Sequence, residues 1–244
     1  MRFDVLTLFP DMFNAVLGDS IVGRAQAAGL LEFNFVNIRD FSANKHKKTD
    51  DYPYSGGGGM LMTPQPIYDA YKSITADCGE KPHTIFMSPQ GQVFNQKKAV
   101  ELAGYDRLVF LCGHYEGVDQ RVLDMLVDEE ISVGDFVLTG GELPAMTVID
   151  AVARMIPGVL AGEGSYTNES HFSGLLEYPQ YTRPEEFMGV KIPEVLISGH
   201  HKNIEIWKRH KALETTLKKR PDMLEKAELD ADDIKYLKQL GYEK

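Results

Sequence analysis

Residues 108–119 have the sequence LVFLCGHYEGVD, in which an apolar run leads directly into a polar, glycine-containing turn. The apolar part predicts a buried β-strand at residues 108–111. The same arrangement occurs where residues 84–87 lead into SPQG at 88–91, and where 130–133 lead into GDFVLTGGE at 134–142. Each turn alone is typical of an ordinary strand-to-helix connection. Because ligands of open α/β sheets bind outside the carboxyl ends of the strands, the three together predict a ligand-binding crevice.

The elements around these turns predict a parallel α/β sheet. Further strands are expected at residues 3–8 and 31–38, and helices at about 67–74, 96–102, 118–127 and 142–155. Asp11 is expected to cap a helical stretch that ends at Gly29. A long polar connection at residues 39–66 is expected to be functional or mobile. Strands that alternate with helices are typical of a parallel sheet with helices on its faces.

The pattern changes after residue 157, where glycine, serine and asparagine accumulate and predict a linker. Helices follow at residues 204–217, 223–227 and 231–240, with Pro221 opening the second. We therefore predict an α/β domain at residues 1–160, a linker at 161–175 and a small all-α domain at 176–244.

The composition indicates a cytoplasmic protein. With 43% hydrophobic residues the chain has enough apolar side chains for a core, and no stretch approaches the roughly 18 consecutive apolar residues of a membrane span. Asp4 and Asp11 interrupt the apolar start, so no signal peptide is expected. Cys78 and Cys112 lack metal-ligand or CxxC spacing and are expected to be thiols in a reducing compartment.

The distribution of charge leaves room for a nucleic-acid partner although the net charge is −10. Acidic and basic residues balance in residues 176–244, so the excess negative charge belongs to residues 1–175. Residues 199–220 are locally basic, with three histidines in the same stretch. This segment is either a local footprint for nucleic acid or a solvated helix face.

Several classes of site are disfavoured by missing motifs. The chain has no GxGxxG or GxxxxGK[ST] loop, no HxxxH or HExxH pair and no GxSxG elbow. A dinucleotide site, a P-loop, a zinc site and a serine hydrolase are therefore disfavoured. Turns that hold a ligand through backbone groups suit an adenosine without a phosphate chain. Glu116 is open to three interpretations: it attracts a sulfonium cation, holds Mg²⁺ or is an exposed turn residue.

Three other features have two interpretations each. Residues 54–60, YSGGGGM, form either a hinge or a loop that closes on a phosphate backbone or a flipped base. Arg154, late in a predicted helix, either complements the helix dipole or has a site role. Glu169 is either a solvated linker acid or a functional carboxylate.

The combination of motifs resembles the bacterial tRNA (guanine-N1)-methyltransferases, the TrmD family of the SPOUT superfamily. The resemblance runs nearly end to end through FDVLTLFPDMF, DYPYSGGGGMLMTPQP, SPQGQVFNQ, LCGHYEGVDQRV, ISVGDFVLTGGELPAMTVIDAVARMIPGVL, GLLEYPQYTRP, VLISGHHKNIEIWK and KRPDML. It implies transfer of a methyl group from S-adenosylmethionine to N1 of the guanosine immediately 3′ of the tRNA anticodon, guanosine 37. It also implies a deep trefoil knot, a homodimer with the active site at the subunit interface, and dependence on Mg²⁺.

The resemblance places the cofactor in the knot. Carried onto this sequence, its contacts are Met87, Ser88, Pro89, Gln90, Gly91, Gly113, Tyr115, Glu116, Gly117, Ser132, Val133, Gly134, Leu138, Gly140, Gly141 and Pro144. Contacts with tRNA are expected from the basic residues of the C-terminal domain, namely Arg183, Lys202, Lys208, Arg209, Lys211, Lys218, Lys219 and Arg220.

The same resemblance implies a catalytic pair, Arg154 and Glu169. Glu169 would accept the N1 proton of guanine, and Arg154 would stabilise negative charge on O6. The family usually has aspartate at the position of Glu169 and an aromatic residue at that of His171, so this sequence departs from the pattern at both. Three alternatives remain: a non-catalytic RNA-binding protein with this fold, a nucleotide-dependent oxidoreductase, and a knotted methyltransferase acting on ribose 2′-OH or ribosomal RNA.

Overall fold

The computed structural model describes residues 1–76, 78–162, 166–167 and 169–242. The chain divides into two compact units, Met1–Glu163 and Gly164–Lys244. Of the predicted linker at 161–175, residues 163–165 and 168 lie outside the described part. Leu175, which we had assigned to that linker, packs in the core of the second unit.

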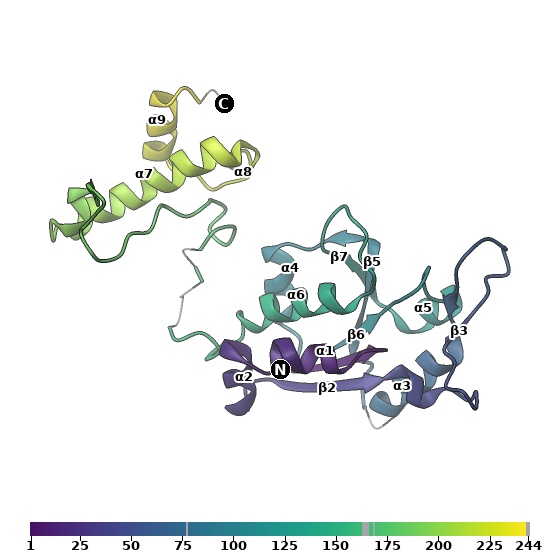
Figure 1. Cartoon of the computed structure of the whole chain (residues 1–244). Coiled ribbons are helices and arrows are strands. Elements are labelled where there is room, and N and C mark those ends of the chain that lie inside the picture. The colour runs from purple at the N-terminus through teal and green to yellow at the C-terminus, as the bar shows by residue number, and fades with distance from the viewer. Residues whose placement is uncertain (77, 163–165, 168, 243–244) are drawn as a thin grey trace. The chain divides into compact units, whose positions relative to one another are not determined.

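The first unit is built on a parallel five-stranded sheet (Figure 1). Its strand order is β2-β1-β6-β5-β7, with β1 at Arg2–Thr7, β2 at Glu32–Asn37, β5 at His83–Val93, β6 at Arg107–Cys112 and β7 at Glu129–Ser132. These five strands are the five expected from the sequence, and their pairing confirms the prediction of a parallel α/β sheet.

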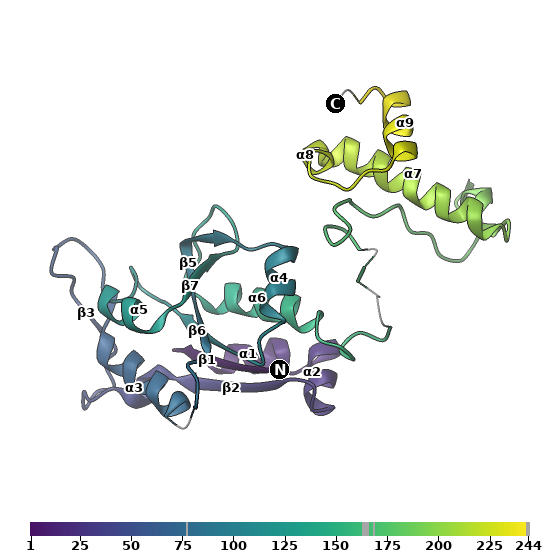
Figure 2. The same ribbon diagram turned by 180° about the vertical axis from the view of Figure 1, so that it is seen from behind.

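Helices of the first unit form two groups by their contacts (Figures 1 and 2). In one group, α1 (Asp11–Leu17) and α4 (Gln96–Leu102) pack against α6 (Glu142–Ala153), and α2 (Ser20–Ala27) packs against α1. In the other, α3 (Pro64–Thr75) packs against α5 (Gln120–Leu126) and the 3₁₀ helix η1 (Ile38–Phe41).

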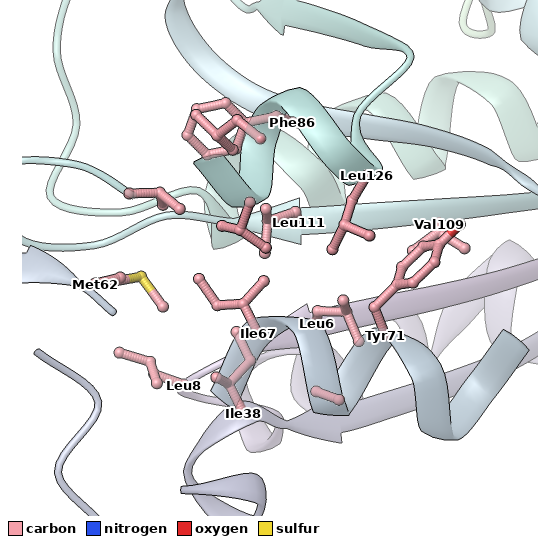
Figure 3. Close-up of a cluster of buried hydrophobic side chains, with 14 residues drawn as sticks. Leu6, Leu8, Ile38, Met62, Ile67, Tyr71, Phe86, Val109, Leu111 and Leu126 are labelled. Carbon is pink, nitrogen blue, oxygen red and sulfur yellow. The ribbon is translucent and has the colours of Figure 1, made fainter. Parts of the chain in front are cut away.

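The second group covers a continuous apolar core (Figure 3). Leu6 and Leu111 of the sheet meet Ile67 of α3 and Leu126 of α5 there. Because successive side chains of a strand point to opposite faces, Val5, next to Leu6, is buried toward the other helices. The apolar character of the strands on both faces thus follows from helices on both sides.

Two local predictions near the N-terminus are wrong. Asp11 is the first residue of α1 rather than its cap, and no side chain caps that helix. The helical stretch expected up to Gly29 is two helices, because α1 ends at Gly18 and Asp19 caps α2 by accepting a hydrogen bond from the Ser20 N–H.

The long polar connection has structure of its own. It contains η1 and a short antiparallel pair, β3 (Asp50–Asp51) and β4 (Leu61–Met62). The glycine-rich residues 56–59 form the turn between these two strands.

The second unit is mainly helical. The sequence predicts an all-α domain, and this prediction is wrong because the unit also contains a short hairpin. It contains α7 (His201–Lys219), α8 (Pro221–Leu224) and α9 (Ala231–Gln239), with Pro221 opening α8 as predicted. It also contains the 3₁₀ helix η2 (Glu194–Ile197) and a hairpin of β8 (Glu186–Phe187) and β9 (Val190–Lys191). Its core is a small cluster formed by Leu175, Leu213, Leu224 and Leu237. No helix in the described ranges is both long and apolar enough to cross a membrane.

A buried carboxylate lies at the amino end of the sheet. Asp4 of β1 has no exposed surface and accepts hydrogen bonds from Arg2, Asn34 and Arg107, with the Arg107 Nε to Asp4 Oδ2 distance at 2.7 Å. Burial alone would raise the pKa of Asp4, but these three donors outweigh it and lower the pKa below its usual value. Asp4 therefore ties together β1, β2 and β6.

We expect Asp4→Asn to destabilise the first unit by about 3 kcal/mol at pH 7, because it leaves two arginines without their buried partner. A carboxylate whose pKa is lower in the folded state than in the unfolded state stabilises the fold at pH values above its unfolded pKa. This stabilisation is lost as the pH falls through the pKa of the folded state. The difference between variant and wild type should therefore shrink below about pH 4.

Calorimetric unfolding at several pH values measures this difference. Glu32→Gln is the matched control, because Glu32 pairs with the same Arg2 at 3.0 Å but is 64% exposed, and it should cost less than about 1 kcal/mol. If both variants lost the same free energy of unfolding, the burial of Asp4 would not be the reason for its stabilising effect.

Candidate functional site

The three turns that follow β5, β6 and β7 meet around one cleft at the carboxyl end of the sheet. The cleft is lined by Phe86, Met87, Ser88, Pro89, Gly113, His114, Tyr115, Glu116, Gly117, Ile131, Ser132, Val133, Phe136, Val137, Leu138, Thr139, Gly140, Gly141 and Pro144. Segments that are distant in sequence thus form a single concave surface, in the place where open α/β sheets bind ligands.

Most of the predicted cofactor-binding residues lie in this lining. The exceptions are Gln90, Gly91 and Gly134, which belong to the same turns without lining the cleft. A Cβ atom on Gly91 would lie 2.4 Å from the Glu130 backbone carbon, so Gly91 serves the close packing of β5 on β7. The cleft brings the other predicted residues together, while their binding role stays a prediction.

Sequence reasoning missed six lining residues: Phe86, His114, Ile131, Phe136, Val137 and Thr139. His114, Phe136, Val137 and Thr139 belong to the turns that predict the crevice but are not among the cofactor contacts carried over from the resemblance. Phe86 and Ile131 lie in the strands before those turns. The position of His114 between Gly113 and Tyr115, both predicted contacts, was the signal that could have identified it.

Glycine is required where the second and third turns touch. The Gly141 N–H donates to the Gly113 carbonyl oxygen at 2.9 Å. A Cβ atom on Gly141 would lie 2.7 Å from the Cys112 Cα, which is closer than real Cβ contacts. The two backbones therefore meet with no side chain between them, and the cleft wall at this point consists of peptide groups.

The turn after β7 is held by its own side chain. The Ser132 hydroxyl donates to the Gly134 carbonyl oxygen at 2.9 Å, and Gly134 has a φ of +147° that favours glycine. This bend directs Phe136 and Leu138 along the cleft, where both side chains remain exposed. Exposed apolar side chains of this kind offer contact area to a ligand.

A buried polar chain runs behind the cleft wall. Glu142, the first residue of α6, is 2% exposed and accepts a hydrogen bond from the Thr7 hydroxyl at 2.6 Å. Its other oxygen lies 2.7 Å from the Nε2 of His114, whose ring also packs against Phe9 at a centroid distance of 4.9 Å. Burial, with nearby Glu142 adding to its effect, raises the pKa of the Cys112 thiol well above its usual value.

The glycine-rich turn between β3 and β4 adjoins Glu116. The Met62 N–H donates to the Gly117 carbonyl at 2.9 Å, and the Asp119 N–H donates to the Met62 carbonyl at 3.0 Å. A Cβ atom on Gly59 would lie 2.3 Å from the Glu116 Cγ. The turn is thus fixed to the cleft at its β4 end, while Tyr54 near its other end is fully exposed.

The predicted catalytic pair is not in the cleft lining. Arg154 is the C-cap residue of α6, whose third residue, Pro144, lines the cleft. Ten residues of helix separate the two by about 15 Å, further than an arginine side chain reaches. Glu169 belongs to the second unit, where it is half-buried and its N–H donates to the Tyr166 carbonyl at 3.2 Å.

The predicted tRNA-binding residues differ in their surroundings. Arg209 of α7 pairs with the buried Asp233 and donates to the Glu228 carbonyl, so it holds α9 against α7. Lys208, Lys211 and Arg220 pair with acids two or three residues away. The other four, Arg183, Lys202, Lys218 and Lys219, have no ion pair within the described ranges.

Metal ligands are scarce in the described residues, which contain no group of three histidine, cysteine, aspartate or glutamate side chains able to hold an ion. Glu116 is exposed in the cleft lining and supplies a single carboxylate there.

Comparison with known proteins gives a consistent result. Residues 1–226 match the family model described as tRNA (Guanine-1)-methyltransferase TrmD. A tRNA (guanine-N(1)-)-methyltransferase of Ruminiclostridium cellulolyticum is 60% identical over 226 residues, covering 93% of this chain and 97% of the relative. Proteins of the same name from Alkaliphilus metalliredigens and Bacillus cereus are 52% and 51% identical, covering 100% and 98% of both chains respectively.

We expect Gly141→Ala to lower the stability of the first unit by about 1–3 kcal/mol, because the added methyl group overpacks the contact with Cys112. Unfolding by urea measures the loss. Gly58→Ala is the control, since Gly58 has no atom within 4 Å of the position of an added Cβ and its φ is not positive. A loss no larger than that of the control would show that the two turns are free to separate.

Proposed function

The chain belongs to the tRNA (guanine-1)-methyltransferase family, and we propose that it methylates N1 of guanosine 37, the nucleotide immediately 3′ of the anticodon. S-adenosylmethionine supplies the methyl group, and N1-methylguanosine and S-adenosylhomocysteine are the products. The observation that carries this proposal is the cleft at the carboxyl end of the sheet, whose wall at Gly113 and Gly141 consists of backbone.

The chemistry of the cleft fits this cofactor. Peptide N–H and C=O groups can bind the polar edges of an adenosine, and exposed Leu138 and Phe136 can cover its rings. The carboxylate of Glu116, also exposed in the lining, attracts a positively charged sulfonium. The phosphate-binding loops that a dinucleotide would need are missing from the sequence.

Arg154 and Glu169 are the residues that we assign to the reacting base. Guanine N1 carries a proton at neutral pH, so a base must accept that proton as the methyl group is transferred, and Glu169 has this role. Negative charge then develops on O6. The guanidinium of Arg154, which stays charged and presents fixed donors, stabilises it. The presence of both groups favours an enzyme over a non-catalytic RNA-binding protein.

The position of Arg154 supports an active site shared by two copies of the chain. One helix length separates Arg154 from the cleft of its own unit. The exposed side of α6 carries Leu143, 51% exposed, and the neighbouring α1 region adds Met12 and Val16 at 39% and 56%. We assign this apolar face to a symmetric homodimer contact that brings Arg154 of one subunit to the cleft of the other.

The trefoil knot is part of the same proposal. Its support is the backbone contact between the turns after β6 and β7, together with the parallel bridge between Met62 and Val118. The first contact joins two of the cleft turns, and the second joins β4 to the chain just after the turn that follows β6.

The tRNA backbone is assigned to the C-terminal unit. Arg183, Lys202, Lys218 and Lys219 are our principal candidates, because each is exposed and has no acidic partner in the described structure. Lys208, Lys211 and Arg220 contribute a weaker field because adjacent acids partly neutralise them. We place the activity in the cytoplasm, in keeping with two free thiols.

Magnesium is not built into this mechanism. The described residues offer a single cleft carboxylate, Glu116, and no cluster of three ligands. These residues do not fit an ion held by protein groups alone.

We expect labelled methyl groups from S-adenosylmethionine to appear in an unmodified tRNA transcript that has guanosine at position 37, and not in the same transcript with adenosine there. Nucleoside analysis should identify the product as N1-methylguanosine. Label in ribose 2′-O-methyl groups, or equal label in both transcripts, would instead identify a different methyltransferase.

We expect Arg154→Ala and Glu116→Ala each to lower the transfer rate by orders of magnitude, because one loses charge stabilisation at O6 and the other the carboxylate near the sulfonium. When the two inactive variants are mixed and allowed to exchange subunits, activity should return. One shared site of such a mixed dimer has both residues intact.

The control is each variant mixed with itself, which should stay inactive. No recovery after subunit exchange, shown independently with differently tagged chains, would place Arg154 and Glu116 in the same subunit's site.

A further inference from the structure

The partly buried His114 and the buried Glu142 form a hydrogen-bonded pair that the methyl-transfer roles assigned above do not use. Glu142 is 2% exposed, yet both of its oxygens have partners: the Thr7 hydroxyl at 2.6 Å and the His114 Nε2 at 2.7 Å. Thr7 in turn accepts a hydrogen bond from the Phe9 N–H at 2.9 Å. A buried carboxylate with this many contacts holds its neighbours in one arrangement.

The partners of Glu142 determine which nitrogen of His114 carries a proton. The Thr7 hydroxyl donates to one carboxylate oxygen, and the other oxygen accepts from His114 only if Nε2 carries a hydrogen. Glu142 is also the first residue of α6, where negative charge interacts favourably with the helix N-terminus. A neutral His114 therefore has its hydrogen on Nε2 and a lone pair on Nδ1.

The second nitrogen of His114 is available to a ligand. His114 lines the cleft, and its Nδ1 has no hydrogen-bond partner among the residues that the structure describes. In the described residues, the buried side-chain polar atoms without a hydrogen-bond partner are the hydroxyls of Thr49 and Tyr71. The Nδ1 of His114 is not among them, so it is not sealed in the interior. Nδ1 is thus a polar atom that reaches the cleft surface.

The ring itself is fixed on several sides. It packs against Phe9 and lies edge-on to Tyr115 at a centroid distance of 6.3 Å. A Cβ atom on Gly140 would lie 2.3 Å from the His114 Nε2 and 2.6 Å from a Glu142 oxygen, so the loop passes directly over the pair. Gly140 therefore closes the pair in, and the imidazole has little freedom to turn.

We propose that His114 binds the cofactor, with Nδ1 accepting a hydrogen bond from an N–H or O–H group of S-adenosylmethionine, and that Glu142 is the positioning residue that sets this acceptor. The inference rests on the proposed function, since it takes the cleft as the cofactor site. It adds two residues to that site, one that touches the ligand and one that acts through it.

His114→Gln is the variant that separates binding from structure. The glutamine amide can still donate to Glu142 from a position close to that of Nε2, but it has no counterpart of Nδ1. We expect its Kd for S-adenosylhomocysteine, measured by titration calorimetry, to rise about tenfold while the melting temperature stays near that of the wild type. A purely structural role for His114 would leave the affinity unchanged in a folded variant.

The chain offers a matched control in His83 and Glu129. This pair has the same Nε2-to-carboxylate distance of 2.7 Å, and the His83 ring stacks on Tyr105 at 4.4 Å. Both residues lie at the amino ends of their strands and neither lines the cleft. We expect His83→Gln to leave the Kd for S-adenosylhomocysteine unchanged.

The role of Glu142 is tested by combining variants. Glu142→Ala should weaken binding in the wild-type background and have no further effect on affinity in the His114→Gln background, because the residue it positions is already lost. Should Glu142→Ala fail to fold, the His114→Gln measurement still decides the proposal.

Two results would overturn the inference: an affinity of His114→Gln within about twofold of the wild type, or the same loss in His83→Gln. Failure of the proposed function is distinguishable from either, since the wild-type protein itself would then not bind S-adenosylhomocysteine.

Discussion

The backbone hydrogen bond from the Gly141 N–H to the Gly113 carbonyl is the contact on which the rest of the site depends. It joins the turn after β6 to the turn after β7, and it leaves no room for a side chain at Gly141. Because α6 begins at the next residue, the contact also fixes where that helix starts and where Glu142 enters the interior. A single peptide-to-peptide contact thus places the cleft wall, a helix N-terminus and a buried carboxylate together.

The two buried acids of the first unit differ in what they hold. Asp4, at the amino end of the sheet, is surrounded by two arginines and an asparagine, and its hydrogen bonds join neighbouring strands. Glu142, at the carboxyl end, has only a hydroxyl and an imidazole as partners. Arginine donors compensate the charge of Asp4, whereas the two hydrogen bonds of Glu142 fix the orientation of a hydroxyl and an imidazole. Structural support and the proposed ligand-binding cleft therefore lie at opposite ends of the same sheet.

The sequence predicts the strands and the cleft turns, because their residue patterns follow directly from the burial and direction of the strands. Strands such as β1 and β6 were predictable because apolar runs between polar turns require burial on both faces, and the edge strand β2 because its apolar and polar residues alternate. The converging turns were predictable because parallel strands present their carboxyl ends on one side. The break at Gly18 was missed, although a capping residue, Asp19, follows the glycine there. The β8–β9 hairpin was also missed, because its two-residue strands are too short to show alternation. His114 was missed because its partner Glu142 lies 28 residues away in sequence and meets it only in the fold.

The charge distribution of the chain supports the proposed division of substrate binding between its units. The first unit contains the cleft and carries the excess negative charge, so it repels a polyanion on average. Attraction must come from the C-terminal unit, yet Arg209 there is committed to Asp233, and Lys208, Lys211 and Arg220 have acidic partners. Of the eight proposed residues, only Arg183, Lys202, Lys218 and Lys219 remain without an acidic partner in the described residues, which limits the affinity that these positions give to nonspecific RNA. An RNA that also places a base in the cleft gains contacts that other RNAs lack. Under the proposed function, a chain whose first unit is acidic therefore selects RNA by the reacting base more than by charge alone.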